Sequence, residues 1–222
     1  MMTGARENDR QVATTEPLQE NGVVFVVDDD AEVREYVRWL LASKGLNVQA
    51  FDDPQAFLDS LSGGLPGDTP ACLVTDLRMP GLSGLDLQAE IAARGIELPI
   101  IMISAYAEVS SAVHAMREGA MDFLEKPFDG PQLLERVEAA LRANREARRT
   151  ASRRAEVAAA LARLTPRQRV VLEGLTAGKP SKIIASELGV SPRTVDVHRF
   201  RLMHALGAQS LPDLFRLVML AR

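Results

Sequence analysis

Two short apolar runs in the first half of the chain each end on carboxylates. Residues 23–27 (Val-Val-Phe-Val-Val) lead into Asp28 and Asp29, and a second run ends on Asp76 shortly before a Pro80–Gly81 turn. Short apolar runs of this kind are typical of strands buried on both faces of a parallel sheet. Because the carboxyl ends of parallel strands lie along one edge of a sheet, the three acids are expected to converge there.

A cluster of carboxylates suits Mg²⁺, which prefers oxygen ligands and takes one or two carboxylates together with waters and phosphate oxygens. The sequence therefore predicts a magnesium-dependent phosphoryl site. An alternative stays open for residues 28–30. Asp side chains at the start of a helix accept hydrogen bonds from free backbone N–H groups and interact favourably with the helix dipole, so these acids could be solvated helix-start residues.

Two further strand ends supply groups that a phosphorylated aspartate needs. The run at 99–103 finishes on Ser104, a hydroxyl donor, and the run at 120–125 leads into Lys126 and Pro127. A lysine beside three carboxylates balances their repulsion and can bind a phosphoryl oxygen. Pro127 permits a cis peptide bond, which could turn the lysine into the site. The alternative for Lys126 is an ordinary exposed lysine.

Apolar helical patterns alternate with these strands along the first 145 residues. Such alternation predicts a doubly wound α/β fold with a five-stranded parallel sheet in a flavodoxin-like order. The last helix of this part is expected to start near Pro131. Its apolar residues at helical spacing are Leu133, Leu134, Val137 and Leu141.

The strand-end motifs occur in a familiar order and spacing: they are Asp28-Asp29, Thr75-Asp76-Leu-Arg-Met-Pro-Gly, Ser104-Ala105 and Lys126-Pro127-Phe128. On these motifs, residues 22–145 resemble the receiver domain of two-component response regulators. The resemblance implies that Asp76 is the phosphoacceptor, that Asp29 binds Mg²⁺ directly and that Asp28 binds it through water. It further implies that the backbone carbonyl of Arg78 completes the protein ligands, and that Ser104 and Lys126 contact the phosphoryl group.

The same resemblance implies a switch between two conformations. Its members here are Ser104, Phe123 on the last strand, and Tyr106, which is expected to tune the switch. For Phe123 the alternative is core packing, because an aromatic residue in an apolar strand more often fills the core.

The length and composition of the chain limit the number of domains and indicate the compartment. A chain of 222 residues permits two domains. Cys72, the single cysteine, lies within an apolar strand and reads as a small buried residue in a reducing compartment. Residues 1–21 are polar and predict a disordered tail. No stretch has the length and apolar character of a signal peptide or a membrane span, so a cytoplasmic protein with no membrane partner is expected.

The net charge changes sign along the chain. Residues 1–130 contain 9 Lys and Arg against 22 Asp and Glu, a net charge of −13, whereas residues 131–222 contain 17 against 8, a net charge of +9. This asymmetry indicates metal and phosphate chemistry in the first part and nucleic-acid binding in the second. Between them, the arginine-rich residues 146–160 predict a solvated helical linker in preference to a DNA contact.

Capping residues divide the remaining residues, 161–222, into four short helices. Thr165 and Pro166 begin the first, Ser181 the second and the residues about Arg193 the third, which ends at Leu206. The fourth covers residues 211–220. Two short helices around the Gly189 turn predict a helix-turn-helix. The residues expected to face inward in the first two helices are Val171, Leu172, Leu175, Ile183, Ile184 and Leu188.

Residues 164–220 resemble LuxR/FixJ-type DNA-binding domains. The motifs are Leu164-Thr-Pro-Arg-Gln, Ala177-Gly-Lys, Ile184-Ala185, Leu188-Gly-Val-Ser and Thr194-Val-Asp-Val-His198-Arg199. The two resemblances together imply a FixJ-like transcription regulator. Its partners would be a sensor histidine kinase, double-stranded DNA and RNA polymerase, with a homodimer formed on phosphorylation and transcription activated.

A helical wheel of the third helix separates a core face from an outer face. Val195, Leu202 and Leu206 lie on the first. The outer face is expected to meet the major groove, with Val197 and Phe200 touching thymine methyl groups and Asp196 accepting from cytosine N4. The candidates for phosphate contact are Lys182, Arg193, Thr194, Arg199 and Arg201. His198 fits either DNA contact or packing.

Two other function classes share features with this sequence. Phosphatases of the haloacid dehalogenase type also use an Asp nucleophile, but they commonly place a second Asp two residues later, where this chain has Arg78. A non-enzymatic regulator is therefore expected. A regulator that binds DNA without phosphorylation, with Asp29 and Asp76 purely structural, stays open.

Overall fold

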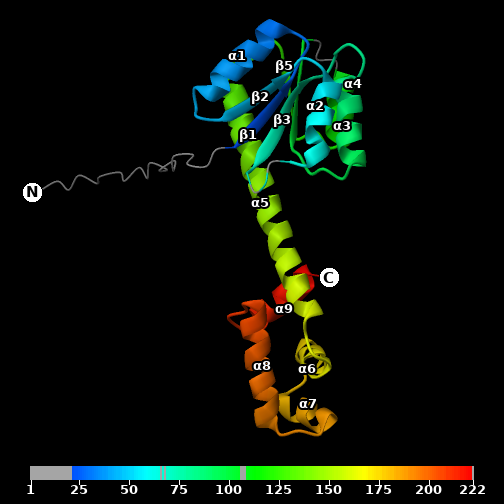
Figure 1. Cartoon of the computed structure of the whole chain (residues 1–222), viewed down its shortest axis with the longest axis vertical. Helices are drawn as coiled ribbons and strands as arrows, with labels where there is room; N and C mark the ends of the chain where they lie inside the picture. The colour runs from blue at the N-terminus through cyan, green and yellow to red at the C-terminus, as the bar shows by residue number, and fades with distance from the viewer. Residues whose placement is uncertain (1–21, 66, 68, 106–108, 222) are drawn as a thin grey trace, which may run out of the picture. The chain divides into compact units, whose positions relative to one another are not determined.

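A parallel sheet of five strands forms the centre of the first part of the chain (Figure 1). The structure is a computed structural model, which describes residues 22–65, 67, 69–105 and 109–221. The chain divides into two compact units, with Asn144 as the last residue of the first and Arg145 as the first residue of the second. The tail expected at residues 1–21 lies outside the described residues.

The strands lie in the order β2-β1-β3-β4-β5, and every neighbouring pair is parallel. Their bounds are β1 Val23–Val27, β2 Asn47–Phe51, β3 Ala71–Asp76, β4 Ile100–Ser104 and β5 Asp122–Glu125. This is the flavodoxin-like order expected from the sequence, and the prediction is confirmed. Because Val27 pairs with Thr75 and Asp76 pairs with Ile103, the carboxyl ends of the central strands lie level with one another.

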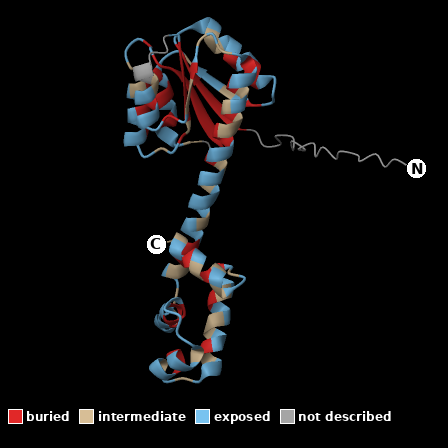
Figure 2. Cartoon of the chain, turned by 180° about the vertical axis from the view of Figure 1, so that it is seen from behind, coloured by how far each residue is buried: buried red, intermediate tan, exposed pale blue. Residues whose placement is uncertain are grey.

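Helices cover both faces of the sheet, so its strands are apolar throughout rather than alternating with polar residues. Along β1, Val23, Phe25 and Val27 pack on one face, in a cluster that includes Phe57 of α2. Val24 and Val26 pack on the other, in a cluster with residues of α1 and α5. Figure 2 shows the sheet as a buried layer between helices that are exposed on their outer sides.

The helices of the first unit connect the strands in turn. They are α1 Ala31–Ala42, α2 Pro54–Ser60 with the 3₁₀ turn η1 Leu61–Gly63, α3 Gly84–Ala93, α4 Val109–Arg117 and α5 Gly130–Ala162. Helix α5 begins one residue before the expected Pro131 and continues without a break through the expected linker. Cys72 is fully buried in β3, as predicted. No described helix is both long enough and apolar enough to span a membrane.

The second unit is helical and has its own core. Its helices after α5 are α6 Pro166–Thr176, α7 Ser181–Leu188, α8 Pro192–Leu206 and α9 Leu211–Leu220. Thr165 and Gln168 form a capping box at α6, and the Ser191 and Ser210 side chains cap α8 and α9. Gly189 and Gly207 end α7 and α8 in the left-handed conformation, which favours glycine.

One inward residue was predicted wrongly. Ile183 is 48% exposed, whereas its neighbours Ile184 and Ala185 are buried. On a helix, adjacent residues differ by about 100° in direction, so the short helix α7 buries Ile184 and turns Ile183 towards solvent. Leu188, one turn beyond Ile184, is partly buried against the same cluster, as expected.

Candidate functional site

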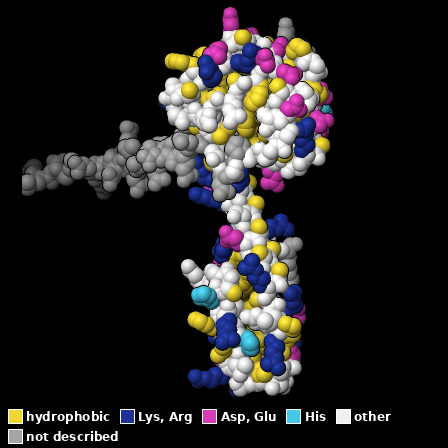
Figure 3. All heavy atoms as spheres, viewed as in Figure 1, with side chains coloured by type: hydrophobic (Ala, Val, Ile, Leu, Met, Phe, Trp, Pro, Cys, Tyr) yellow, Lys and Arg dark blue, Asp and Glu magenta, His cyan; other side chains and the backbone are white. Residues whose placement is uncertain are grey.

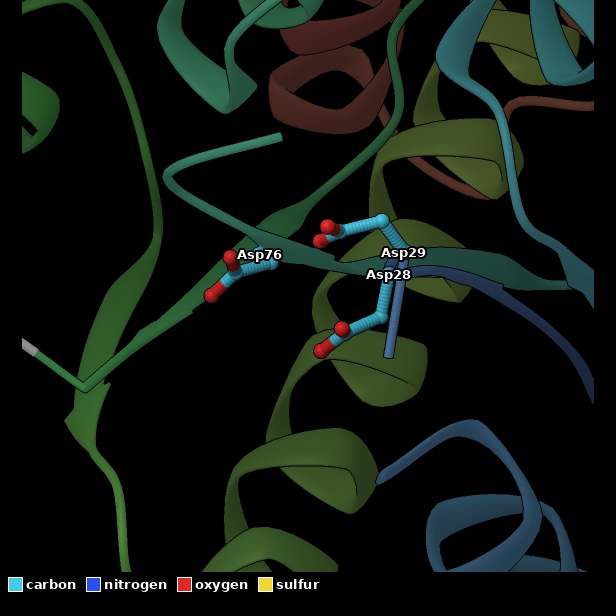
Figure 4. Close-up of side chains that lie close together, drawn as sticks. All are labelled: Asp28, Asp29 and Asp76. Atoms are coloured by element: carbon cyan, nitrogen blue, oxygen red, sulfur yellow. The ribbon is translucent and has the colours of Figure 1, made fainter. Parts of the chain in front are cut away.

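Three carboxylates meet at the carboxyl edge of the sheet. Asp28 and Asp29 follow β1, and Asp76 is the last residue of β3. One oxygen from each lies within 4.8 Å of the other two, and Figure 4 shows the three side chains next to one another. Asp28 is fully buried, Asp76 is almost buried and Asp29 is exposed. The acids therefore form a cluster with one side open to solvent.

Lys126 joins two of these acids. Its Nζ lies 2.7 Å from Oδ2 of Asp28 and 3.1 Å from Oδ1 of Asp76. The side chain is only 16% exposed, which sets it apart from an ordinary surface lysine. The peptide bond between Lys126 and Pro127 is cis. A lysine held between the two acids offsets part of their mutual repulsion.

For both Asp76 and Lys126, burial and the neighbouring charges shift the pKa in opposite directions. Burial raises the pKa of Asp76, and the charge and hydrogen bond of Lys126 offset only part of that rise. Burial lowers the pKa of Lys126, but the hydrogen bond to Asp28 and the charges of Asp28 and Asp76 outweigh it, so the net pKa is raised. Lys126 is therefore held in its charged form.

Asp28 and Asp29 have different surroundings. Oδ1 of Asp28 accepts from the backbone N–H of Asp30 at 2.9 Å, Oδ2 accepts from Lys126, and its carbonyl oxygen accepts from Arg34 Nη1 at 2.6 Å. Asp29 has no hydrogen bond or ion pair with any described residue. Its carboxylate is thus available to a cation, while that of Asp28 is already shared.

The helix-start interpretation applies to the third acid of the run. Asp30 is the N-cap of α1, and its Oδ1 accepts from the N–H groups of Glu32 and Val33 at 2.9 and 3.4 Å. Among the described contacts, neither the Asp28 nor the Asp29 carboxylate accepts from an N–H group within α1, and the only backbone N–H that donates to the Asp28 carboxylate is that of the N-cap residue itself. Residues 28–30 therefore divide into two cluster acids and one capping residue.

Of the remaining residues expected at the site, Arg78 lies next to Asp76. The N–H of Arg78 donates to Asp76 Oδ2 at 3.3 Å, which brings the backbone of residue 78 next to that carboxylate. Ser104 ends β4 and is buried. Phe123 on β5 is partly buried against the core cluster, consistent with its packing alternative. Tyr106 lies outside the described residues.

These groups fit Mg²⁺ by the chemistry of their atoms. The cluster offers only oxygen donors, and one exposed carboxylate leaves room for waters and a phosphoryl group, as Mg²⁺ requires. No nitrogen or sulfur ligand that would favour zinc is part of the cluster. Asp29 and Asp76 are the residues that would hold the ion.

The outer face predicted for α8 is present. Val195, Leu202 and Leu206 are buried, whereas Val197 and Phe200 are 44% and 72% exposed. The other candidates on α7 and α8 divide into exposed residues, which are Lys182, Arg193, Asp196 and Arg201, and half-buried residues, which are Thr194, His198 and Arg199. Figure 3 shows basic side chains distributed over the visible face of this unit.

Two of the half-buried candidates, Thr194 and His198, have different surroundings. The N–H of Thr194 donates to the capping hydroxyl of Ser191 at 3.1 Å, and the two hydroxyls lie 2.9 Å apart. His198 is half-buried, and its Nδ1 has no hydrogen-bond partner in the described part of the chain. The hydrogen bond from the Ser181 hydroxyl to Asp196 was not predicted from the sequence. Two polar residues 15 positions apart carry no local signal of pairing.

Each of the two units matches a known protein family. Residues 24–138 match the response regulator receiver domain, and residues 162–218 match the bacterial regulatory proteins of the luxR family. The chain belongs to the two-component response regulators with a LuxR-type DNA-binding domain. This is a family of transcription regulators and not of enzymes, so the dehalogenase-type alternative is excluded.

Relatives of this response regulator share both of its domains. It is 44% identical to the transcriptional regulatory protein FixJ of Bradyrhizobium diazoefficiens, over 90% of this chain and 96% of the relative. It is 37% identical to the response regulator protein TodT of Pseudomonas putida, over 87% and 84%.

Solved structures give the same result. Response regulator StyR is 39% identical, with a TM-score of 0.76 over 90% of this chain and 98% of StyR. Full-length FixJ from B. japonicum is 43% identical, with a TM-score of 0.57 over 91% and 98%. The response regulator therefore spans nearly the full length of both solved structures.

Proposed function

We propose that Asp76 accepts a phosphoryl group from a sensor histidine kinase, and that this modification controls dimerisation and DNA binding. The observation that carries the proposal is the position of Lys126, which contacts both Asp28 and Asp76 beside the open carboxylate of Asp29. The receiver would comprise residues 22–145, the helical linker 146–160 and the DNA-binding domain 161–222. The family membership of the chain supports this division of labour.

The reaction would begin at the Asp76 carboxylate. One of its oxygens attacks phosphorus, the bond from phosphorus to the kinase histidine nitrogen breaks, and the imidazole leaves with the electron pair. Lys126 Nζ, 3.1 Å from Asp76, is placed to bind a phosphoryl oxygen. Asp29, Asp76 and the Arg78 carbonyl would hold Mg²⁺, with Asp28 acting through water, and the bound ion would supply positive charge to the phosphoryl oxygens.

A groove beside the site supports the kinase as donor. It has a volume of about 450 Å³, is mostly apolar, and is lined by Glu32, Val33, Tyr36, Ala105, Lys126, Pro127 and Phe128. The rings of Tyr36 and Phe128 lie 6.1 Å apart on its walls. Because Lys126 belongs both to the groove and to the acidic cluster, a helix seated there would present a phosphohistidine to Asp76.

Dimerisation is supported by exposed apolar side chains on α4 and just before β5. Val113, Met116 and Met121 are 45%, 47% and 36% exposed. Bonding of Ser104 and Lys126 to a phosphoryl group would pull on β4 and the end of β5, and repacking near Phe123 would reshape this surface. A receiver dimer formed there would present two helix-turn-helix units to a two-fold DNA site.

The second unit would bind double-stranded DNA through α7 and α8. We assign phosphate contacts to Lys182, Arg193, Thr194, Arg199 and Arg201, and base contacts to Val197 and Phe200, with His198 packed behind them. The net charge of +9 over residues 131–222 supports this assignment. The output would be activation of transcription through RNA polymerase, and the protein would act in the cytoplasm, where its DNA lies.

The test is phosphorylation by acetyl phosphate with Mg²⁺, with Asp76→Asn as the control. Labelling and molecular mass by light scattering are followed together. Base-labile phosphate on wild type alone, with a change from monomer to dimer, is expected. Absence of labelling would support the phosphorylation-independent regulator instead, and labelling at constant mass would remove dimerisation from the proposal.

A further inference from the structure

Asp196 of α8 contacts a different helix. Its Oδ1 accepts from the hydroxyl of Ser181, the first residue of α7, at 3.1 Å. The same oxygen lies 3.9 Å from Nη2 of Arg199, one turn further along α8. A single carboxylate oxygen therefore joins the start of α7 to two positions on the helix expected to enter the major groove.

Among the residues that the structure describes, no side chain makes a capping hydrogen bond at the start of α7. Its N-cap is Pro180, which makes no side-chain capping bond, whereas Thr165, Ser191 and Ser210 cap the neighbouring helices. A negative charge near the first turn of a helix is favourable because the free N–H groups there carry partial positive charge. Asp196 brings such a charge to α7 through Ser181.

Reading a base would leave only Oδ2 of Asp196 for cytosine, because Oδ1 already accepts from Ser181. A carboxylate reads cytosine by accepting from N4, which requires an oxygen directed into the groove. One oxygen of Asp196 is occupied by Ser181 and lies near Arg199. An acid on a surface that approaches phosphates is also repelled by them, so its presence needs a compensating role.

We propose that Asp196 is a positioning residue that does not itself contact a base. It sets sequence preference by holding the start of α7 against α8 and by orienting the Arg199 side chain. This inference rests on the proposed DNA-binding function. It predicts that Ser181 and Asp196 act as one unit, although only Asp196 is charged.

The test uses full-length protein phosphorylated with acetyl phosphate and a library of randomised double-stranded DNA. Wild type, Asp196→Ala, Ser181→Ala and the double variant are each used for selection. Dissociation constants are then measured for the selected sequence and for a scrambled duplex, because their ratio reports specificity independently of net charge. Each single variant is expected to lower this ratio by roughly 2- to 10-fold, the range for loss of one hydrogen bond.

Non-additivity is the decisive result. Because the two residues share one contact, the double variant should lose no more specificity than whichever single variant has lost more. Asp196→Asn keeps an oxygen that can accept from Ser181 but lacks the charge near α7 and Arg199, so it should lose less specificity than Asp196→Ala. Glu187→Gln removes an exposed charge of α7 that pairs with Lys179 at 2.6 Å, and should leave the ratio unchanged.

A contrary pattern would overturn the inference. If Asp196→Ala loses preference at one base pair while Ser181→Ala keeps the wild-type ratio, Asp196 reads a base. Thermal unfolding of each variant accompanies the selection. If Asp196→Ala does not fold, Ser181→Ala and Asp196→Asn still decide between the two roles. A wild-type protein that selects no sequence would instead refute the proposed DNA-binding function, and the inference with it.

Discussion

Asn144 of α5 hydrogen-bonds to Ala71, 73 positions earlier in the chain. Its Oδ1 accepts from the Ala71 N–H at 3.0 Å, and its Nδ2 donates to the carbonyl of Glu97 at 3.1 Å. The side chain is 2% exposed. One buried amide thus holds the last receiver turn of α5 against the start of β3 and the segment before β4.

Asn144→Ala is expected to lower the free energy of unfolding by about 1–3 kcal/mol, because it leaves the Ala71 N–H buried without an acceptor. Urea denaturation measures this change. Asn47→Ala, at an exposed position of β2, is the matched control and should change stability by less than about 0.5 kcal/mol. Equal effects for the two variants would show that the buried contact contributes nothing.

Lys126→Met should lower the free energy of unfolding, and the size of this decrease should depend on the magnesium concentration. The substitution leaves the buried Asp28 without its ion-pair partner, which costs about 3–5 kcal/mol. Added MgCl₂ should recover part of the loss, since a cation that binds only the folded state stabilises it. Urea unfolding with and without MgCl₂ checks both points.

Lys44→Met is the matched control for that experiment. Lys44 is exposed in the turn after α1, and its side chain makes no hydrogen bond or ion pair with the residues that the structure describes. Its loss should be nearly neutral in either buffer. A Lys126→Met variant as stable as Lys44→Met would contradict the ion pair.

Gly84→Ala should damage the phosphoacceptor site. A Cβ at this position would lie 2.4 Å from the carbonyl oxygen of Asp76 and 3.1 Å from Cα of Leu77, and backbone atoms cannot move aside as a flexible side chain can. We expect a loss of about 1–3 kcal/mol in stability together with slower labelling by acetyl phosphate. Gly63→Ala, where the new Cβ meets nothing within 4 Å, should leave labelling unchanged.

Ile184 and Ile183 offer an adjacent pair with opposite surroundings. Ile184→Ala removes a fully buried side chain from the core of the second unit and should cost about 2–5 kcal/mol. Ile183→Ala should cost less than about 1 kcal/mol, because that side chain is 48% exposed. Thermal unfolding of the two variants compares them directly, and similar losses would reject the orientation of α7 described above.

Local sequence signals accounted for most element boundaries. Thr165, Ser191 and Ser210 cap helices where a hydroxyl precedes an apolar pattern, and Gly189 ends α7. The pattern failed at Ile183, because two adjacent isoleucines in a helix of eight residues give no periodicity to choose between them. Only packing against α6 and α8 selects which one is buried.

The sequence by itself determined the order of strands and helices, the convergence of Asp28, Asp29 and Asp76, and the change of charge between the two units. These follow from apolar runs, caps and turn residues, which act over a few positions. The tertiary structure alone decided that Lys126 bonds to Asp28, 98 positions away, that Asp29 keeps a free carboxylate, and that Asp196 meets Ser181. Such contacts depend on how the intervening elements pack, because every helix, strand and turn between two distant residues affects where their side chains lie.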